Sequence, residues 1–371
     1  MNNHNYKQNA YYLLYLIRCV LNDKTPTKEK LDKMDLSGVF TVAEAHSLPA
    51  IAAYALESAG LRDQRFIEAK YKAIRKDVTF DFERQAVISE LEKAGIWYCP
   101  LKGCIIKNWY PDSGMRQMAD NDILVNGEKM SEVRDIMEQL EFETKLFGMG
   151  HQDVYEKEPV YNFEMHSCLV EPRHGDLIYD YYLNIKKKLI KDEDNSFGYH
   201  FRDEDFYIYF VSHEYKHFSG AGTGLRSLVD TYIINSHFKN SLDNKYVSEE
   251  LKKLCIYDFE RDSRRLAEKV FNGIKLDENE KQMLDIFIFS STYGNFKMQM
   301  KNRGVDGSFL SKVKYVVRRL SLTERDLKEN HPFFYRHRAL RPLLYIKRLT
   351  LKTLKSPKAL IAEIRILRRF K

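Results

Sequence analysis

Patterns typical of β-strands occupy only one segment of this 371-residue chain, and helical patterns occupy both sides of it. From residue 8 to about residue 95, apolar side chains recur at the three- and four-residue spacing of amphipathic helices. At Trp97 the pattern changes to short apolar runs separated by proline and glycine, and helical spacing returns after about Asp203. The sequence therefore predicts the α+β class, with a small mixed-sheet core embedded in helical N-terminal and C-terminal regions.

These changes divide the chain into four expected regions. They are a helical N-terminal region, an α/β core, a helical region that binds the nucleotide or substrate, and a basic helical C-terminal region, at residues 1–95, 96–202, 203–300 and 301–371. In the core, strands are expected at 97–101, 122–125, 141–147 and 160–170, with a helix at 128–140. Other helices are expected at 68–93, 206–217, 225–237, 249–270 and 278–290. We interpret the charges spread along 68–93 as a solvated helix face.

The net charge of +7 combines two unlike parts of the chain. Residues 311–371 hold 18 Lys and Arg against 4 Asp and Glu, a net charge of +14, so the other 310 residues carry −7. This basic region predicts an anionic partner. Three interpretations stay open: RNA bound through its phosphates, an anionic membrane surface bound by a helix such as 358–371, or packed helices that expose a solvated basic face.

The chain carries no signal for membrane insertion or secretion. No stretch reaches the roughly 18 uncharged apolar residues of a membrane-spanning helix, and the apolar run at 11–17 lacks a cleavage pattern. The five cysteines are scattered and form no C-x-x-C pair, which argues against a disulfide framework or a thiolate zinc site. We therefore expect a cytoplasmic protein without a transmembrane segment.

Three carboxylates are candidates for metal binding and catalysis. Asp120 and Asp122 stand two positions apart at the mouth of an expected strand, and the strand period of two places both side chains on one face. Glu164 lies in another expected strand between two large apolar residues, where a buried charge needs a partner. If the two strands are neighbours, the carboxylates converge, as two-metal phosphoryl transfer with Mg²⁺ requires.

Residues that suit phosphate precede these carboxylates. Lys102 and Gly103 stand between a strand and the start of a short helix, where backbone N–H groups favour phosphate. Arg116 lies just before the aspartates and is placed to hold a phosphate or a leaving pyrophosphate.

These segments and several later ones together make the sequence resemble the uncharacterised nucleotidyltransferase family of the polymerase-β-like superfamily. They occur in the expected order over roughly Trp97 to Gly294. The segments are Leu101-Lys102-Gly103, Trp109-Tyr110-Pro111, Gly114-Met115-Arg116, Asp120 to Val125, Phe163-Glu164-Met165-His166, His213 with His217, Gly222 to Asp230 and Ser291 to Gly294.

The resemblance implies a nucleotidyltransferase fold in which Asp120, Asp122 and Glu164 hold two Mg²⁺ ions and an NTP is the substrate. It implies that Glu164 helps to activate the acceptor hydroxyl and that the glycine at 103 belongs to the loop that cradles the triphosphate. Two positions depart from the superfamily pattern: Cys104 stands where a small polar residue is usual, and Asn121 where an apolar residue is usual. The first departure leaves the phosphate geometry open, and the second concerns the opposite strand face.

A rival motif lies at 213–217, where His-Glu-Tyr-Lys-His matches H-E-x-x-H. In that pattern two histidines bind zinc and the glutamate acts as a base. The third metzincin histidine is replaced by Thr223, and Asp230 is the nearest later carboxylate. A zinc metallopeptidase is therefore an alternative function, although it leaves the three carboxylates unexplained.

We instead expect His213, His217, Arg226 and Asp230 to line the substrate cleft opposite the carboxylates. The small-residue loop at 219–224, which leads into the next helix, suits nucleotide recognition. The competing interpretation is that Arg226 and Asp230, four residues apart, only pair on a helix surface.

The sequence favours a Mg²⁺-dependent enzyme that transfers a nucleoside monophosphate from an NTP to an acceptor hydroxyl and releases pyrophosphate. The acceptor is not identified and is a small molecule, a protein or an RNA. The alternative from another class is a catalytically degenerate, nucleotide-binding regulatory or interaction protein.

Overall fold

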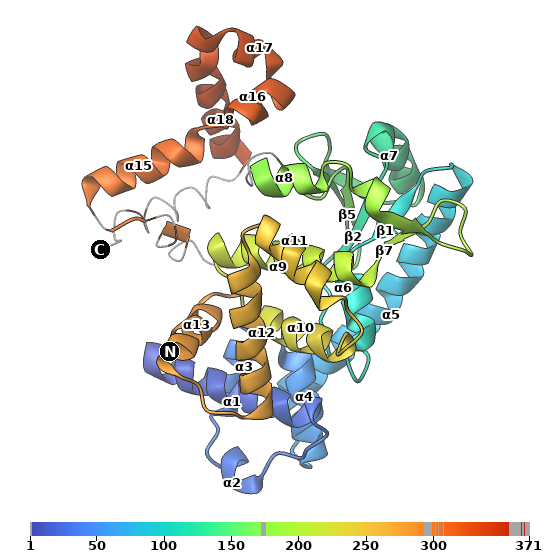
Figure 1. Ribbon diagram of the computed structural model, residues 1–371. Coiled ribbons are helices and arrows are strands. Elements are labelled where there is room, and N and C mark those ends of the chain that lie inside the picture. The colour runs from blue at the N-terminus through green and yellow to red at the C-terminus, as the bar shows by residue number, and fades with distance from the viewer. Residues whose placement is uncertain are drawn as a thin grey trace.

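The computed structural model describes residues 2–171, 176–292, 299–300, 302, 304–306, 308–355, 365 and 367. Helices dominate it, and the strands found in these residues lie between residues 98 and 201 (Figure 1). The predicted α+β class, a small mixed sheet embedded in helical regions, is confirmed. The region boundaries at 95, 202 and 300 remain predictions. None of the described helices has both the length and the apolar character needed to cross a bilayer.

Five helices precede the sheet. Two of them, α1 and α5, begin after Asn2 and Asp63, whose side chains accept a backbone N–H of the first turn. The helices before the sheet and those after it bury their apolar residues in one shared core. The five are α1 (Asn3–Leu21), α2 (Lys28–Leu31), α3 (Leu36–Ala45), α4 (Pro49–Ser58) and α5 (Gln64–Lys93).

The long helix α5 joins the helical part of the molecule to the sheet. It confirms the helix expected at 68–93 and has 30 residues, so it spans about 45 Å. Its buried residues Phe66, Ala73, Phe80 and Val87 recur every seven positions and therefore form one stripe. Phe66 packs in the core of the helical part and Val87 in the core beneath the sheet.

One five-stranded sheet forms the α/β core, with the strand order β1-β2-β5-β4-β3. β2 and β5 run parallel and the other neighbours antiparallel, and the parallel register places Asp122 opposite Glu164. The strands are β1 (Tyr98–Pro100), β2 (Asn121–Val125), β3 (Glu143–Leu146), β4 (Gln152–Lys157) and β5 (Tyr161–His166).

Side chains alternate along β2 and β5 and so give the sheet two different faces. Apolar residues such as Ile123 and Met165 pack against α5 and α7 (Met130–Gln139) and bury one face. Asp122 and Glu164 stand at the alternate positions and therefore belong to the other face, toward α9 (Asp203–Ser219).

β4 is absent from the expected strands. Its buried residues alternate as Asp153 and Tyr155, so an acidic side chain occupies a position where the strand pattern calls for an apolar one. The backbone N–H of Gly148 donates to Asp153 Oδ1 at 2.7 Å, which gives the buried carboxyl a partner. The short hairpin of β6 (Leu189–Lys191) and β7 (Tyr199–Phe201) is likewise not expected.

Three of the four helices expected between residues 206 and 290 are confirmed, at 206–217, 225–237 and 278–290, whereas a helix at 176–182 was not expected. The single helix expected at 249–270 is wrong, because the chain forms α11 and α12 with a break at Cys255, whose φ is +58°. Leu254 and Ile256 on either side are buried, so the turn lets both helices contribute to the core. The helices are α8 (Asp176–Tyr182), α9 (Asp203–Ser219), α10 (Leu225–His237), α11 (Asn244–Lys253), α12 (Tyr257–Asn272) and α13 (Glu278–Phe289), and α6 (Gly103–Ile106) follows β1.

The C-terminal helices extend away from the body of the molecule (Figure 1). Arg325 of α16 pairs with Asp180 of α8 at 2.7 Å and so ties them to it. The helix expected at 358–371 lies outside the described residues, apart from residues 365 and 367. The elements are α15 (Phe309–Leu320), α16 (Glu324–Asn330), α17 (Pro332–Arg336) and α18 (Arg341–Lys355).

Candidate functional site

One cavity of about 340 Å³ lies between the carboxylate face of the sheet and the helices α9 and α10. All ten residues proposed from the sequence line this cavity, although they are spread over more than a hundred positions of the chain. Their chemical roles remain predictions. The ten are Lys102, Gly103, Arg116, Asp120, Asp122, Glu164, His213, His217, Arg226 and Asp230.

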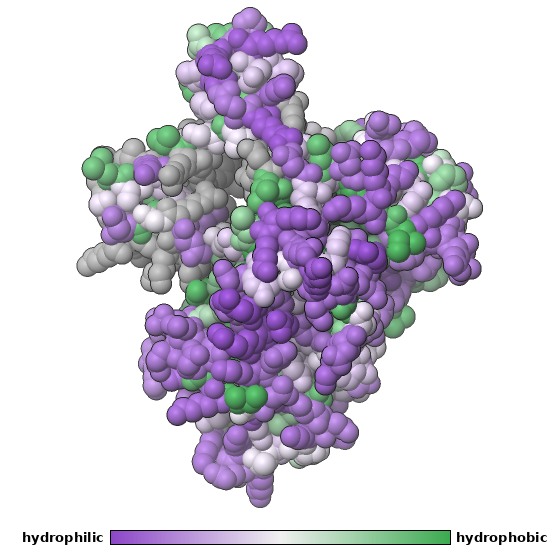
Figure 2. All heavy atoms as spheres, in the orientation of Figure 1, coloured by the Kyte–Doolittle hydropathy of each residue, from purple (hydrophilic) through white to green (hydrophobic). Residues whose placement is uncertain are grey.

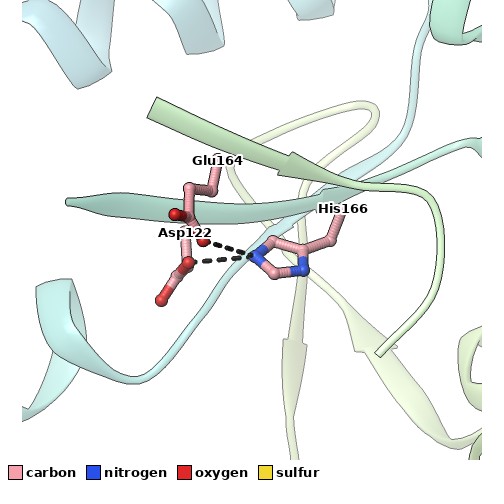
Figure 3. Close-up of side chains that lie close together, drawn as sticks. All are labelled: Asp122, Glu164 and His166. Carbon is pink, nitrogen blue, oxygen red and sulfur yellow. Dashed lines mark hydrogen bonds and ion pairs between the residues drawn. The ribbon is translucent and has the colours of Figure 1, made fainter. Parts of the chain in front are cut away.

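Asp122, Glu164 and His166 form a cluster in which one ligand atom of each residue lies within 4.8 Å of the other two (Figure 3). His166 Nε2 is 2.9 Å from Asp122 Oδ1 and 3.9 Å from Glu164 Oε2. Within the described part of the chain, this is the one such group of His, Cys, Asp or Glu side chains. Asp120 lies just before β2 and lines the same cavity, but it stands outside this cluster.

The three carboxyls influence one another strongly. Burial, together with the charges of Asp122 and Asp120, raises the pKa of Glu164 to about 7. Burial and the charge of Asp122 also raise the pKa of Asp120. Burial acts in the same direction on Asp122, but Lys102 Nζ at 3.9 Å and the hydrogen bond from His166 outweigh it and hold the pKa of Asp122 below its ordinary value. A divalent cation between these carboxyls would relieve their repulsion.

The donor set fits a hard divalent cation such as Mg²⁺, because it is rich in carboxylate oxygens. Neighbouring side chains also orient these oxygens: Gln152 Nε2 donates to Glu164 Oε2 at 2.5 Å, and His166 contacts Asp122. Burial lowers the pKa of His166, so the ring is neutral and donates from Nε2 to the carboxylate. Sequence reasoning missed Gln152, which carries no motif of its own.

A buried ionic layer lies on the α5 side of β2. Asn121 accepts a hydrogen bond from Arg84 Nη1 at 3.0 Å, and Arg84 pairs with Asp81 at 2.5 Å. Lys107 Nζ lies 2.5 Å from Asp77 and 2.6 Å from Asp81, with only 4% of its side chain exposed. The interpretation of the α5 charges as a solvated face is therefore wrong for this part of the helix. The unusual asparagine between the two aspartates fastens β2 to α5 and thereby helps to position them.

Arg116 is held in place by Asp230. The guanidinium makes two contacts with this carboxylate, Nε to Oδ1 at 2.8 Å and Nη2 to Oδ2 at 3.0 Å, and the Tyr110 hydroxyl donates to Oδ1 at 2.7 Å. The competing interpretation of a surface pair between Arg226 and Asp230 is wrong, because Asp230 is buried and Arg226 donates to the carbonyl of Gln117 at 3.2 Å. Asp230 thus acts on the cavity through Arg116.

The turn from β1 into α6 carries Lys102 and Gly103. Lys102 has a φ of +21°, which is unusual for a residue with a side chain. A Cβ at Gly103 would lie 3.1 Å from Arg116 Nη1, so glycine leaves room for that guanidinium. Cys104 packs with Phe80 away from the cavity lining, and burial raises the pKa of its thiol to about 11, so it is not placed as a nucleophile.

The H-E-x-x-H residues lie on α9 at the same cavity. The Nε2 atoms of His213 and His217 are 3.0 Å apart. Among the residues that the structure describes, no third His, Cys, Asp or Glu joins them in a group close enough to share an ion. Asp230, the nearest later carboxylate, forms an ion pair with Arg116. Burial raises the pKa of Glu214 to about 7, so this side chain, which the sequence offered only as a peptidase base, is a further titratable group of the cavity.

A second cavity of about 250 Å³ adjoins the first along α9. The two cavities share Leu169, Tyr209, His213 and Lys216 in their walls. The described wall of the second cavity is largely aromatic and apolar and contains no acidic side chain. Its other residues are Val170, Ile178, Tyr182, Ser212, Tyr215, Ser219 and Gly220.

One of three comparisons with known proteins finds a match. No curated protein and no solved structure matches the chain. The profile of the uncharacterised nucleotidyltransferase family matches residues 32–272. The match begins well before the resemblance noted from Trp97 onward and includes all ten proposed site residues, whereas Ser291 to Gly294 lie beyond its end. With about two thirds of its length matched, this chain belongs to the uncharacterised nucleotidyltransferase family.

Proposed function

We propose that the protein transfers a nucleoside monophosphate from an NTP to an acceptor hydroxyl and releases pyrophosphate, in the presence of Mg²⁺. The observation that carries this proposal is the opposition of Asp122 and Glu164 across the parallel strands β2 and β5, with Lys102 and Arg116 at the same cavity. Carboxylates that suit metal ions and basic side chains that suit phosphates thus line the same cavity.

We assign the metal-binding role to Asp120, Asp122 and Glu164, which together suit two Mg²⁺ ions. When bound, the ions would neutralise the charge of the triphosphate and of the reacting oxygens. Gln152 and His166 hold two of the carboxylates in orientation, which supports this assignment.

We assign the triphosphate to the basic side of the cavity, formed by Lys102, Arg116 and Arg226. The Arg116 guanidinium reaches the cavity already oriented by its two contacts with Asp230, so little ordering is left for the moment of binding. In this proposal Asp230 is a positioning residue and Gly103 keeps the space beside Arg116 open.

The chemical step needs a proton acceptor near the attacking hydroxyl, and we give this role to Glu164. The acceptor oxygen bonds to the α-phosphorus, its proton passes to the carboxylate, and the bond from the α-phosphorus to the pyrophosphate oxygen breaks. We place the body of the acceptor in the second cavity, because it adjoins the carboxylate cavity through Tyr209 and His213. Its largely apolar wall and its volume favour a small molecule with an aromatic or aliphatic body over an RNA end.

The test is Mg²⁺-dependent pyrophosphate release with ATP, GTP, CTP or UTP and the small-molecule fraction of a cell extract. We expect release with at least one NTP, and we expect Asp122→Asn to lower it by about 10³-fold. Asp135→Asn is the matched control, because Asp135 is exposed on α7, which covers the other face of the sheet, and should keep full activity.

Other outcomes would assign other functions. NTP binding without pyrophosphate release, with all fractions of the extract, would indicate a nucleotide-binding regulatory protein. Tightly held zinc that depends on His213 and His217 would favour the peptidase. Transfer of label only to macromolecules would exclude the small-molecule acceptor while leaving nucleotidyl transfer intact.

We also propose that the protein works in the cytoplasm. Its five cysteines are all free in the structure, and three of them, Cys19, Cys99 and Cys104, are buried thiols. A reducing compartment suits such a chain.

A further inference from the structure

The helix α15 presents its apolar face to solvent. Helical spacing gathers Leu310, Val316 and Val317 on one side, and these side chains are 79%, 38% and 55% exposed. The other side of the helix packs inward through Tyr315, which is 2% exposed and contacts Met300 in a small apolar cluster. A helix on the surface of a globular protein normally turns its apolar face toward the core and its polar face toward solvent.

The same arrangement recurs in α17 and α18. Phe333, Leu343 and Ile346 are 55%, 57% and 61% exposed, while Leu344 packs inward with 3% exposed. Leu343 and Ile346 are three positions apart and so lie on one side of α18. We call the six exposed apolar residues of these three helices the C-terminal apolar face: Leu310, Val316, Val317, Phe333, Leu343 and Ile346.

Basic side chains accompany this face. Residues 308–355 contain 13 Lys and Arg and only 3 acidic residues, and all three acidic residues belong to α16. The exposed cations include Lys314 on α15, Arg336 on α17 and Lys347 on α18. Figure 2 shows hydrophobic residues at the surface of the C-terminal elements, next to hydrophilic ones.

In the part of the chain that the structure describes, polar contacts attach these helices to the body, and the six apolar side chains stay exposed. Arg325 of α16 pairs with Asp180 and lies 4.6 Å over the ring of Tyr179. Asn302 Nδ2 donates to the carbonyls of Phe218 and Gly220 at the end of α9. Among the described residues, polar groups of α16 and of the segment before α15 therefore contribute to the attachment.

We propose that the C-terminal apolar face and the cations beside it dock the protein on an anionic lipid bilayer. Aliphatic and aromatic side chains enter the boundary between headgroups and acyl chains, while Lys and Arg lie at the level of the lipid phosphates. This partner matches both properties of the surface at once. It also explains the outward apolar side of α15, and it does not depend on the nucleotidyl transfer proposed above.

Two other occupants fit less well. A nucleic acid would satisfy the cations, but it would not bury Leu, Val and Ile side chains, since its bases stack on aromatic rings. A second copy of the chain would bring two strongly basic surfaces together, and their repulsion opposes such a dimer. The positive charge of the surface thus favours an anionic partner, and its exposed apolar side chains favour a lipid over a nucleic acid.

The test is co-sedimentation of the full-length protein with vesicles at 0.1 M NaCl. We expect binding to vesicles of three parts phosphatidylcholine and one part phosphatidylglycerol, and little binding to phosphatidylcholine alone. The variant carrying Leu310→Ser, Val317→Ser and Ile346→Ser should bind the anionic vesicles at least about tenfold more weakly. Because these side chains are exposed, the variant should fold, and an unchanged circular dichroism spectrum checks this.

The matched control is Phe82→Ser, which removes an apolar side chain that is 75% exposed on α5 and far from the C-terminal helices in the chain. It should bind as the unchanged protein does. Equal binding of the triple variant and the unchanged protein, or no binding to anionic vesicles, would overturn the proposal. So would a dimer in light scattering that the triple variant abolishes while vesicle binding is absent. None of these outcomes bears on pyrophosphate release with soluble substrates, so the membrane proposal and the nucleotidyl transfer proposal can fail independently.

Discussion

At the scale of single residues, the contacts of the buried His46 imidazole define its protonation and its tautomer. Its Nδ1 accepts the backbone N–H of Leu225 at 3.0 Å, and its Nε2 lies 3.2 Å from the carbonyl of Ile288. Because an amide N–H can only donate, the single proton of the neutral ring is on Nε2. Gly224 is required beside it, since a Cβ there would lie 2.6 Å from Nδ1.

This ring should make stability depend on pH. Burial lowers the pKa of His46 to about 4, whereas the unfolded chain has the ordinary value of 6.5. Above pH 6.5 the ring is neutral in both states. As the pH falls from 6.5 to 4, the unfolded state takes up a proton and the folded state does not, so stability falls by as much as about 3 kcal/mol. Urea unfolding at pH 7.5 and pH 5 measures this, and His46→Gln should flatten the difference. His4→Gln, at an exposed position, is the control and should leave it unchanged.

Replacement of Arg116 by lysine should weaken the binding of the NTP. A lysine keeps the charge but cannot form the two parallel contacts with Asp230, so the cation is no longer fixed at the cavity. We expect Arg116→Lys to raise the KM for the NTP by about tenfold or more, a loss of about 1.4 kcal/mol or more in binding. Steady-state kinetics measure it, and Arg134→Lys on α7, on the other face of the sheet, is the control. An unchanged KM would exclude the phosphate role of Arg116.

Residues of the candidate site could be predicted from the sequence where a polar residue stands out within a short local pattern. Asp120 and Asp122 were singled out because the strand period places both on one face, and Glu164 because it stands between two large apolar residues of another expected strand. The role of Asp230 as a partner of Arg116 was not predictable, because these residues are 114 positions apart and only folding brings them together. The burial of Arg84 and Lys107 was missed for the same reason, since their partners lie on another turn or another element.

At the scale of elements, the contact between α5 and the segment after α6 is held by charge. Lys107 is almost fully buried and neutralises Asp77 and Asp81 on α5. Lys107→Met fills the space but leaves Asp77 without its cation and Asp81 with Arg84 alone, and we expect it to destabilise the fold by about 3 kcal/mol. Denaturant unfolding followed by circular dichroism measures this. Lys93→Met is the control, because that side chain is 66% exposed and its ion pair is at the surface, so its loss should cost less than about 1 kcal/mol.

Most elements could be predicted because their apolar residues follow one period and face one core. α5, α10 and the strands β2 and β5 belong to this class. β4 could not be predicted because the buried Asp153 breaks its pattern, and the break between α11 and α12 falls at Cys255 with no glycine or proline to mark it. Backbone conformations of this kind are decided by tertiary packing, which a local pattern does not contain.

At the scale of the whole molecule, the body and the C-terminal helices are separate in charge and in core. The basic region carries the excess positive charge, and Met300, Val305 and Tyr315 form an apolar cluster apart from the main core. The contacts described between Arg325 and Asp180 and at Asn302 are polar and close to the surface. The body of the molecule should therefore not need the C-terminal helices in order to fold.

A chain ending at residue 307 tests this independence. We expect it to keep a cooperative thermal transition within about 4 °C of the full-length protein, because about 1 kcal/mol or less is lost with exposed ion pairs. A chain that starts at residue 63 should not fold, since α1, α3 and α4 contribute to the main core. Calorimetry of both chains decides the point, and a stable chain lacking the first 62 residues would show that the N-terminal helices form an independent domain.

The single helix α5 has a consequence for how this protein can diverge in evolution. Its apolar stripe repeats every seven residues and contacts two cores at its two ends. One inserted residue would rotate the sheet end of α5 by about 100° against its other end and shift it by about 1.5 Å. The carboxylates of the sheet would then move away from Arg226 on α10, which packs in the core of the helical part. Gaps among related sequences should therefore avoid α5, because even seven residues, which restore the rotation, would lengthen the helix by about 10.5 Å.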